Sequence, residues 1–182
     1  MRTLILAAAL LLAACSSQPV EPTRYYLLRT PVAVTSGDQE SAAEYSLGSV
    51  EVATYIDQPG LVQETGSGEI HMARHHQWAE PLRISLRRFL ATGIGAEAGQ
   101  TVAIMATSPE AGRIDVSIDQ LHGNRRGEAV LVAFWQVSSA NGNVTSHQFS
   151  ESRDLSRDGY TALVEAEQAL LQQLARRIGQ SI

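Results

Sequence analysis

The stretch that decides the fold runs from Asp57 to Leu90 and reads DQPGLVQETGSGEIHMARHHQWAEPLRISLRRFL. Pro59-Gly60 interrupts the strand expected before it. The segment Val62 to Met72 predicts two short strands around Gly66-Ser67-Gly68, a turn whose glycines can adopt a positive φ. From His76 to Pro81 the apolar period changes from two residues to about 3.6. We therefore expect a β-hairpin that leads into the first long helix of the chain.

The helix expected after the hairpin buries one face. Apolar side chains recur at positions i, i+4, i+8 and i+11 of one helical surface: Trp78, Leu82, Leu86 and Phe89. Pro81 suits the first helical turn, where an N–H group has no intrahelical partner. The glycines of Gly93-Ile94-Gly95 then indicate the end of the helix. Taken alone, this pattern describes a segment that packs, so the residues predicted to be structural here are Trp78, Pro81, Leu82 and Phe89.

Other segments have the composition and alternation of β-strands: Tyr25–Leu28, Leu47–Ile56, Thr101–Ala106, Arg113–Leu121, Glu128–Val137 and Val144–Ser152. Thr101–Ala106 is apolar on both faces and predicts a buried inner strand. Val144–Ser152 is polar and predicts an edge strand or a partly exposed strand. Asn141-Gly142, just before it, indicates a type I′ turn.

A second long helix is expected from Asp158 to Ile178, with Asp158 as its N-cap. Its apolar stripe begins with Tyr160, a further residue predicted to be structural. Glu167 interrupts the stripe, and either a place at its margin or an ion pair with an arginine would accommodate the carboxylate. The strands and helices together predict an α/β fold, a single domain with a mixed, mostly antiparallel β-sheet and two main helices.

The first residues are expected to direct export rather than to fold. Leu4 to Leu12 is apolar but too short to span about 30 Å of hydrocarbon as a helix. Leu12-Ala13-Ala14-Cys15 ends it with small residues before the only cysteine, and resembles the lipobox of bacterial lipoproteins. The resemblance implies cleavage after Ala14 and lipid attachment at Cys15. It predicts a signal peptide over 1–14, a lipidated end and tether over 15–23, and a folded domain over 24–182.

Charge and composition exclude some partners. All 14 basic residues are arginines, against 19 acids, and the formal net charge is -5. Removal of residues 1–14 takes away Arg2 and no acid, which leaves the mature part at −6. Nucleic acid is therefore not expected as a partner, since phosphate binding requires a basic face. The face of the first helix opposite its apolar stripe carries three arginines, Arg83, Arg87 and Arg88. They form either a solvated face or a contact for an acidic partner surface or lipid phosphates.

No arrangement of residues indicates catalysis. No Gly-x-Ser-x-Gly elbow is present. No His-x-x-x-His pair lies on an expected helix, and no cysteine accompanies the histidines, as would be typical of a zinc site. Asp115, Asp119 and Glu128 are expected to solvate a sheet face. We predict no catalytic residues, no metal and no cofactor.

The chain resembles the PqiC-type ABC-transport auxiliary lipoproteins. The resemblance rests on the lipobox at Cys15, Tyr25-Tyr26-Leu27, Val50 to Tyr55, Trp78-Ala79-x-Pro81-Leu82, and Asp158-Gly159-Tyr160. It implies an α/β domain that faces the periplasm from the outer membrane, to which Ser16 after the cysteine also points. Its partners would be an MCE-domain protein and, through it, an inner-membrane permease, in a system that moves lipids. The sequence leaves open whether the chain forms a homo-oligomer. The alternative functions are a free-standing envelope lipoprotein, such as a cell-wall binder or assembly factor, and an uncharacterised enzyme.

A subunit without a catalytic site acts through contacts, and contacts concentrate on loops and aromatic anchors. The best candidate surface joins the Tyr55–Leu61 turn to the Glu64–Met72 hairpin. Its candidate partner-binding residues are Tyr55, Leu61, Val62, Ser67 and Arg74. Leu61 and Val62 are apolar where a solvent loop should be polar. Either they meet a partner, or Leu61 tucks under the domain's own sheet.

Overall fold

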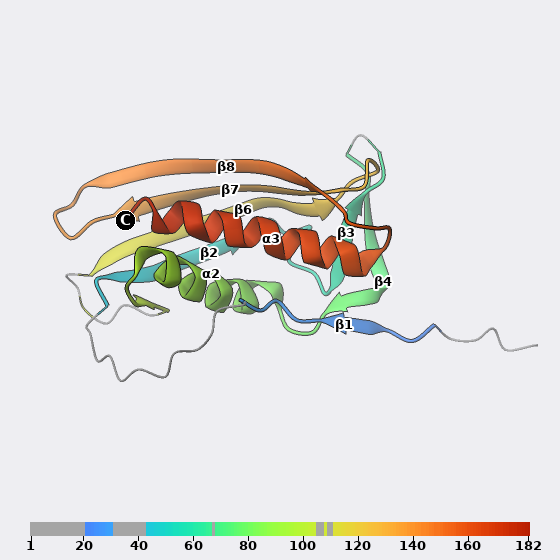
Figure 1. The fold of residues 1–182 in the computed structure, drawn as a ribbon, viewed down its shortest axis with the longest axis horizontal. Helices are drawn as coiled ribbons and strands as arrows, with labels where there is room; N and C mark the ends of the chain where they lie inside the picture. Colours follow the sequence, from blue (N-terminus) through green and yellow to red (C-terminus); the bar gives the residue numbers. More distant parts are fainter. Residues whose placement is uncertain (1–20, 31–42, 67, 105–107, 109–110) are drawn as a thin grey trace, which may run out of the picture.

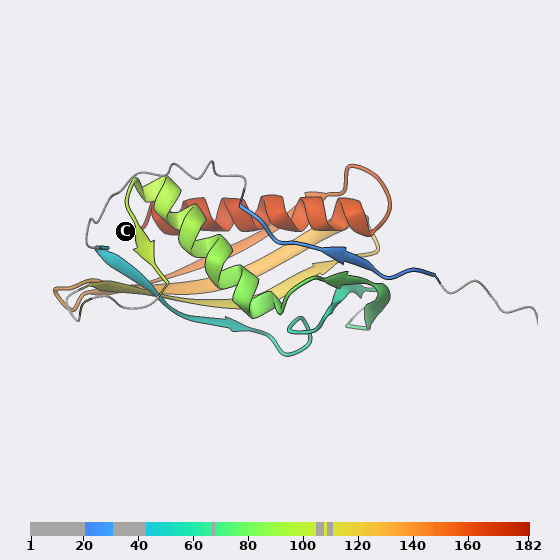
Figure 2. The same ribbon diagram turned by 90° about the horizontal axis from the view of Figure 1, so that it is seen from below.

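The computed structural model describes residues 21–30, 43–66, 68–104, 108 and 111–182, and within them two helices lie on one face of an eight-stranded sheet (Figures 1 and 2). The strands are β1 (Arg24–Tyr26), β2 (Tyr45–Val52), β3 (Gly60–Glu64), β4 (Ile70–Trp78), β5 (Val102–Ala103), β6 (Gly112–Gly123), β7 (Glu128–Ser138) and β8 (Val144–Asp154). The helices are α2 (Leu82–Ala98) and α3 (Tyr160–Gly179). The predicted fold class is confirmed.

Strand β6 is the centre of the sheet. One of its edges pairs with β7, which pairs with β8, and both of these long ladders are antiparallel. The other edge carries two strands in succession, because β2 ends with Val52 opposite Ile118 and β3 then meets β6 at Gly123. Beyond β2 lies β5, and beyond β3 lie β4 and β1. The sheet therefore forks, and the chain between β2 and β3 forms a loop at the fork.

The core lies between the helices and the sheet. In β6 the side chains of Ile114, Val116 and Ile118 are buried, as their alternation predicts. In β7, Trp135 is buried while its neighbour Phe134 is 44% exposed on the other face. Strand β8 is an edge strand, as its polar sequence predicts, and among the described strands it pairs only with β7. One face of the sheet is thus covered by α2 and α3, which also pack against each other.

The junction between hairpin and helix differs from the prediction. Trp78 is the last residue of β4 rather than part of the helix, and α2 begins at Leu82. Pro81 is the N-cap residue, with φ −52° and ψ 123°, so its backbone is extended rather than helical. Trp78 is nevertheless buried, because the end of β4 lies against the same core as the helix.

The predicted end of α2 is also wrong. The helix continues through Gly93 and Gly95 to Ala98 and ends at Gly99, whose φ is 68°. The two inner glycines allow close packing instead. A Cβ at Gly93 would lie 2.8 Å from the Cβ of Ala175 in α3, and one at Gly95 would lie 2.6 Å from the oxygen of Gln100.

Three further local predictions are corrected. Among the described strands, the short strand β5 pairs only with β2 and lies at the end of the sheet rather than inside it. Residues 105 and 106 of the predicted strand lie outside the described residues. Only Gly142 in the β7–β8 turn has a positive φ, so Asn141 does not form the type I′ turn, which requires two. Helix α3 starts after Gly159, with φ 104°, and has no side-chain cap from Asp158.

Strand β2 ends earlier than expected. The prediction extends it to Ile56, but pairing with β6 stops at Val52, and residues 54–56 form a turn. Ala53 still donates a backbone hydrogen bond to Ile118, and its own oxygen accepts from Ile56 and Asp57. The loop at the fork is therefore tightly bonded to its own backbone, and Ile56 turns into the core.

Candidate functional site

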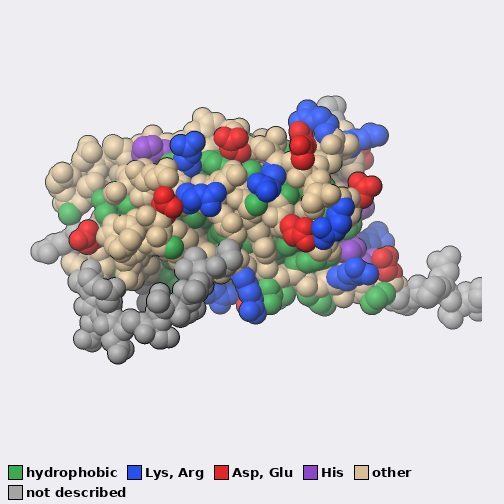
Figure 3. Space-filling view, in the orientation of Figure 1, with side chains coloured by type: hydrophobic (Ala, Val, Ile, Leu, Met, Phe, Trp, Pro, Cys, Tyr) green, Lys and Arg blue, Asp and Glu red, His purple; other side chains and the backbone are tan. Residues whose placement is uncertain are grey.

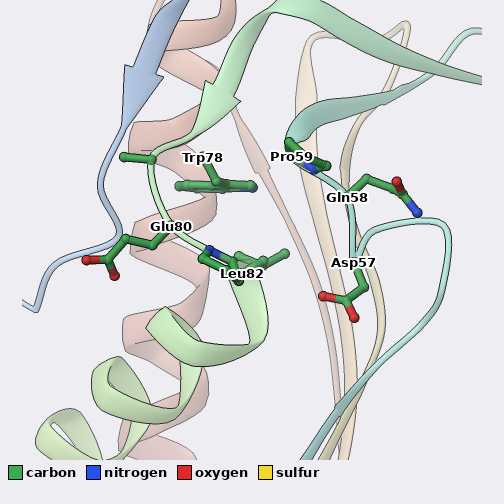
Figure 4. A pocket seen from close by; sticks show the side chains of 8 residues that line it. Asp57, Gln58, Pro59, Trp78, Glu80 and Leu82 are labelled. Atoms are coloured by element: carbon green, nitrogen blue, oxygen red, sulfur yellow. The ribbon is translucent and has the colours of Figure 1, made fainter.

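A pocket of about 270 Å³ lies between the loop at the fork of the sheet and the segment that joins β4 to α2 (Figure 4). It is lined by Asp57, Gln58, Pro59, Trp78, Ala79, Glu80, Pro81 and Leu82. The loop is the one that the sequence singles out as a contact surface, and the joining segment is the Trp-Ala-x-Pro-Leu motif. The fold thus brings the predicted contact loop and the family's sequence motif together at one pocket.

Backbone hydrogen bonds hold the two walls of the pocket at a fixed separation. The N–H of Trp78 donates to the oxygen of Pro59 at 2.8 Å. The N–H of Ala79 donates to the oxygen of Tyr26 in β1 at 2.7 Å. The loop, β4 and β1 are therefore joined where β4 ends, and the indole of Trp78 forms one wall of the pocket (Figure 4).

Arg83, in the first turn of α2, links the helix to the loop. Its guanidinium donates to Asp57 at 2.8 Å and to Glu51 at the end of β2 at 3.2 Å. The hydrogen bond to Asp57 raises the pKa of Arg83, which keeps the side chain cationic. Because all three groups are partly exposed, these ion pairs position the loop more than they stabilise the fold.

The other arginines of α2 also have partners. Arg88 pairs with Glu80 on the pocket segment. Arg87 donates to the backbone oxygens of Leu47 and Gly48 in β2 and to that of Ile104 beyond β5. Arg87 therefore ties the helix to the edge of the sheet, a role that nothing in the sequence pattern indicates. Within the described residues, the three arginines are engaged by the protein's own acceptors and are not a free cationic surface.

The candidate partner-binding residues differ in their exposure. Leu61 and Val62 are 1% and 3% exposed, because β3 is paired on both sides and its side chains enter the core. For these two the surface interpretation is wrong, and the alternative that Leu61 lies under the sheet is correct. Arg74, on β4, is exposed. Ser67 lies outside the described residues.

Tyr55 lies at the start of the loop and is half-buried. Its hydroxyl donates to the backbone oxygen of Asp119 at 3.3 Å, and its ring lies 6.3 Å from that of His122. Burial, together with the charges of Asp119 and Glu64, raises the pKa of Tyr55 to about 12. The phenol is therefore neutral and acts as a hydrogen-bond donor, which fixes the loop to β6.

Next to the pocket, the residue predicted to be structural at the start of α3 is part of an aromatic cluster. The ring of Tyr160 stacks on His76 of β4, with ring centroids 4.3 Å apart, and its hydroxyl donates to Gln63 at 3.4 Å. Tyr26 of β1 lies on the same histidine, with its hydroxyl 2.9 Å from Nδ1. The cluster connects β1, β3, β4 and α3 beside the pocket.

One buried acidic side chain has no ion-pair or hydrogen-bond partner among the described residues. Glu167 of α3 is 2% exposed, and its Oε2 has no hydrogen-bond partner. Neither predicted explanation applies, since the residue is not at the margin of the stripe and pairs with no arginine. Burial raises the pKa of Glu167 to about 8, so the side chain is mainly protonated at neutral pH.

The described part of the chain offers no group of three or more histidine, cysteine or acidic residues that could hold a metal ion. Nor does any helix within residues 21–182 that the structure describes have the length and apolarity to cross a membrane. Asp115, one of the carboxylates on β6, is partly buried. Burial opposes its ionisation, but hydrogen bonds from Arg113 and Ser49 outweigh that effect and lower its pKa to about 2. This is the setting of a structural carboxylate rather than of a general acid.

Comparison with known proteins gives one family. Residues 25–179 match the model of the ABC-type transport auxiliary lipoprotein components. The match covers every strand and helix except the first residue of β1. None of the curated proteins matches the chain.

Solved structures share the fold. One is a crystal structure of an uncharacterised protein, 22% identical, with a TM-score of 0.76 over 88% of this chain and 99% of the other. A second is a protein from Xanthomonas campestris, 15% identical, with a TM-score of 0.72 over 87% of this chain and 94% of the other. At these identities the likeness concerns the fold alone.

Proposed function

The chain belongs to the family of ABC-type transport auxiliary lipoprotein components, and from this premise we propose that it is the outer-membrane subunit of an intermembrane lipid transporter. In this role it is anchored through a lipidated Cys15, faces the periplasm, and docks an envelope-spanning MCE-domain protein. Through that protein it is connected to a permease in the inner membrane.

The proposal rests mainly on the order of two segments along the chain. A lipobox-like segment ending at Cys15 precedes the family's domain, which begins at residue 25. The intervening residues 15–23 reach at most about 30 Å when fully extended. Three acyl chains on one cysteine bind a membrane firmly, since each buried CH₂ contributes about 0.8 kcal/mol. The domain is therefore held within a short distance of one membrane, and a partner must bridge the remaining gap.

The geometry also favours a binding role. The pocket at the fork has apolar walls held by backbone hydrogen bonds, and its charged residues are positioned by ion pairs rather than aligned as a nucleophile and base. Transport energy must then come from another chain. The domain contributes attachment and contact.

The test is co-purification from the cell envelope. The lipidated protein, carrying a C-terminal tag, is solubilised in mild detergent and captured, and the bound proteins are identified by mass spectrometry. We expect an MCE-domain protein and a permease. Recovery of cell-wall enzymes or assembly factors without an MCE protein would favour the free-standing envelope lipoprotein instead. The control is the same capture with an unrelated outer-membrane lipoprotein.

A further inference from the structure

We propose that the pocket at the fork of the sheet receives an arginine or lysine side chain from the partner protein. The inference rests on the proposed function, since it assumes that the domain docks another protein, and it names the chemistry of that contact.

The walls of the pocket suit an aliphatic stem. Trp78 presents the face of its indole, and Leu82 lies opposite it, with Pro59 at the side (Figure 4). Pro81 also lines the pocket. A long basic side chain can lay its methylene groups along such a surface while its charged end stays near water. The indole adds an attraction for a cation placed over its face.

One carboxylate is placed to receive the charged end. The carboxylate of Asp57 is directed toward the pocket, whereas the side chains of Gln58 and Glu80 extend away from it (Figure 4). Asp57 uses Oδ2 for Arg83, at 2.8 Å. In the described part of the chain its Oδ1 has no hydrogen-bond partner, and a carboxylate accepts several donors. An incoming guanidinium or ammonium would bind that oxygen.

The charges around the mouth favour a cation. Three carboxylates, those of Glu51, Asp57 and Glu80, face two guanidinium groups, those of Arg83 and Arg88. One negative charge is left over, in a mature chain of net charge −6. The chain contains no lysine, and both arginines beside the pocket are already paired. A cation supplied by another molecule would balance the remaining negative charge.

The pocket needs little rearrangement to bind. Its two walls are joined by the hydrogen bond from the N–H of Trp78 to the oxygen of Pro59. The ring of Pro81 restricts the backbone at the start of α2. Preformed sites lose less conformational entropy on binding, so a single side chain can contribute measurable affinity.

The experiment measures binding of two small probes of similar length to the full mature chain. n-Butylguanidinium mimics an arginine side chain, and n-pentanol is its neutral counterpart. Trp78 and Trp135 are the only tryptophans, so a Trp135→Phe background makes Trp78 the sole reporter of fluorescence. We expect n-butylguanidinium to shift the emission at a concentration about tenfold lower than n-pentanol, the effect of one charge-assisted hydrogen bond near 1.4 kcal/mol.

Two matched variants test the role of Asp57. Asp57→Asn should remove the preference for the cation. Glu51→Gln removes the other ion pair of Arg83 but does not line the pocket, and should reduce the preference for the cation less than Asp57→Asn does. Equal binding of both probes, or equal effects of the two variants, would overturn the proposal.

Lipid amines are the competing source of a cation. Vesicles of phosphatidylethanolamine that shift Trp78 emission in wild type and not in Asp57→Asn would assign the pocket to a headgroup and overturn the protein contact. The proposed function fails separately. If no MCE protein co-purifies but n-butylguanidinium still binds, the transport role is contradicted. The cation-binding chemistry of the pocket would then still hold. An MCE protein recovered equally well by Asp57→Asn would contradict the pocket as its docking point.

Discussion

Replacement of Glu167 by glutamine should change how the stability of the domain depends on pH. The residue lies in the middle of α3, on the face that packs into the core, and is 2% exposed. Burial raises its pKa from 4.5 to about 8. In the unfolded chain the carboxyl returns to its ordinary pKa and releases its proton near pH 4.5. Between these two values the folded state binds one more proton than the unfolded state.

The sign and size of the effect follow from proton linkage. A raised carboxyl pKa makes the free energy of unfolding fall as pH rises from 4.5 to 8, by at most about 1.4 kcal/mol per pH unit. The cost of keeping Glu167 protonated is then about 1 kcal/mol at pH 5, about 3 kcal/mol at pH 7 and about 4 kcal/mol at pH 8. Glutamine has nearly the same shape and carries no such cost.

The assay is urea unfolding at pH 5, 6, 7 and 8, followed by circular dichroism. The advantage of Glu167→Gln over wild type should grow by about 3 kcal/mol from pH 5 to pH 8, with unchanged m-values. Glu165→Gln is the control on the same helix. Glu165 is exposed and paired with Arg157, which lowers its pKa, so its replacement should not produce a growing advantage. Parallel pH profiles for Glu167→Gln and wild type would refute the reasoning.

Three further outcomes are expected. Trp78→Ala should lower the free energy of unfolding by about 3–5 kcal/mol, because the indole is buried at the end of β4, and a thermal midpoint within a degree or two of wild type would contradict this. Gly60→Ala should cost about 1–3 kcal/mol in chemical denaturation, since its Cβ would lie 2.5 Å from the oxygen of Ala73. Cys15→Ala should leave the precursor uncleaved and unlipidated, as immunoblots and metabolic lipid labelling would show; a processed, lipidated variant would exclude Cys15 as the attachment site.

Much of the fold could be predicted because its strands alternate. Ile114, Val116 and Ile118 alternate with polar residues, and the burial of β6 follows this pattern. The polar composition of β8 likewise indicates an edge. In these segments the local hydrophobic pattern agrees with the tertiary environment, so the sequence alone is sufficient to predict burial and strand position.

The ends of the elements could not be predicted, because they depend on tertiary contacts. Trp78 has helical spacing with Leu82, yet it ends β4, since the hydrogen bond to Pro59 extends the strand and Pro81 delays the helix. Gly93 has the composition of a helix stop. Its actual role, close approach to Ala175, requires knowledge that α3 crosses there.

The candidate site was predicted in part. The loop around Asp57 was identified from Pro59-Gly60 and from its apolar continuation, but that continuation enters the core. Leu61 and Val62 are buried because β3 pairs with a strand on each side. This pairing depends on the whole sheet and cannot be predicted from the five residues of β3. The meeting of the loop with the Trp78–Leu82 segment is likewise visible only in three dimensions (Figure 4).

On the face seen in Figure 3, charges of both signs are interspersed rather than gathered by sign. In the view of Figure 3, arginines and acids are interspersed over α3 and toward the end of the molecule that carries β3 and β4. This agrees with the ion pairs of Arg126 with Glu128 and of Arg157 with Glu165. Recognition by this domain is therefore expected to depend on local sites such as the pocket, not on long-range attraction.

The most direct test of the docking role is site-specific photocrosslinking in cells. A photoreactive amino acid replaces Gln58, at the pocket, or Arg74, on β4, and Asn141 serves as the control. Asn141 lies in the β7–β8 turn, at the end of the sheet opposite the β3–β4 hairpin (Figure 1). We expect an adduct with an MCE-domain protein from positions 58 and 74 and none from position 141. An adduct from position 141 alone, or no MCE adduct from any position, would contradict it.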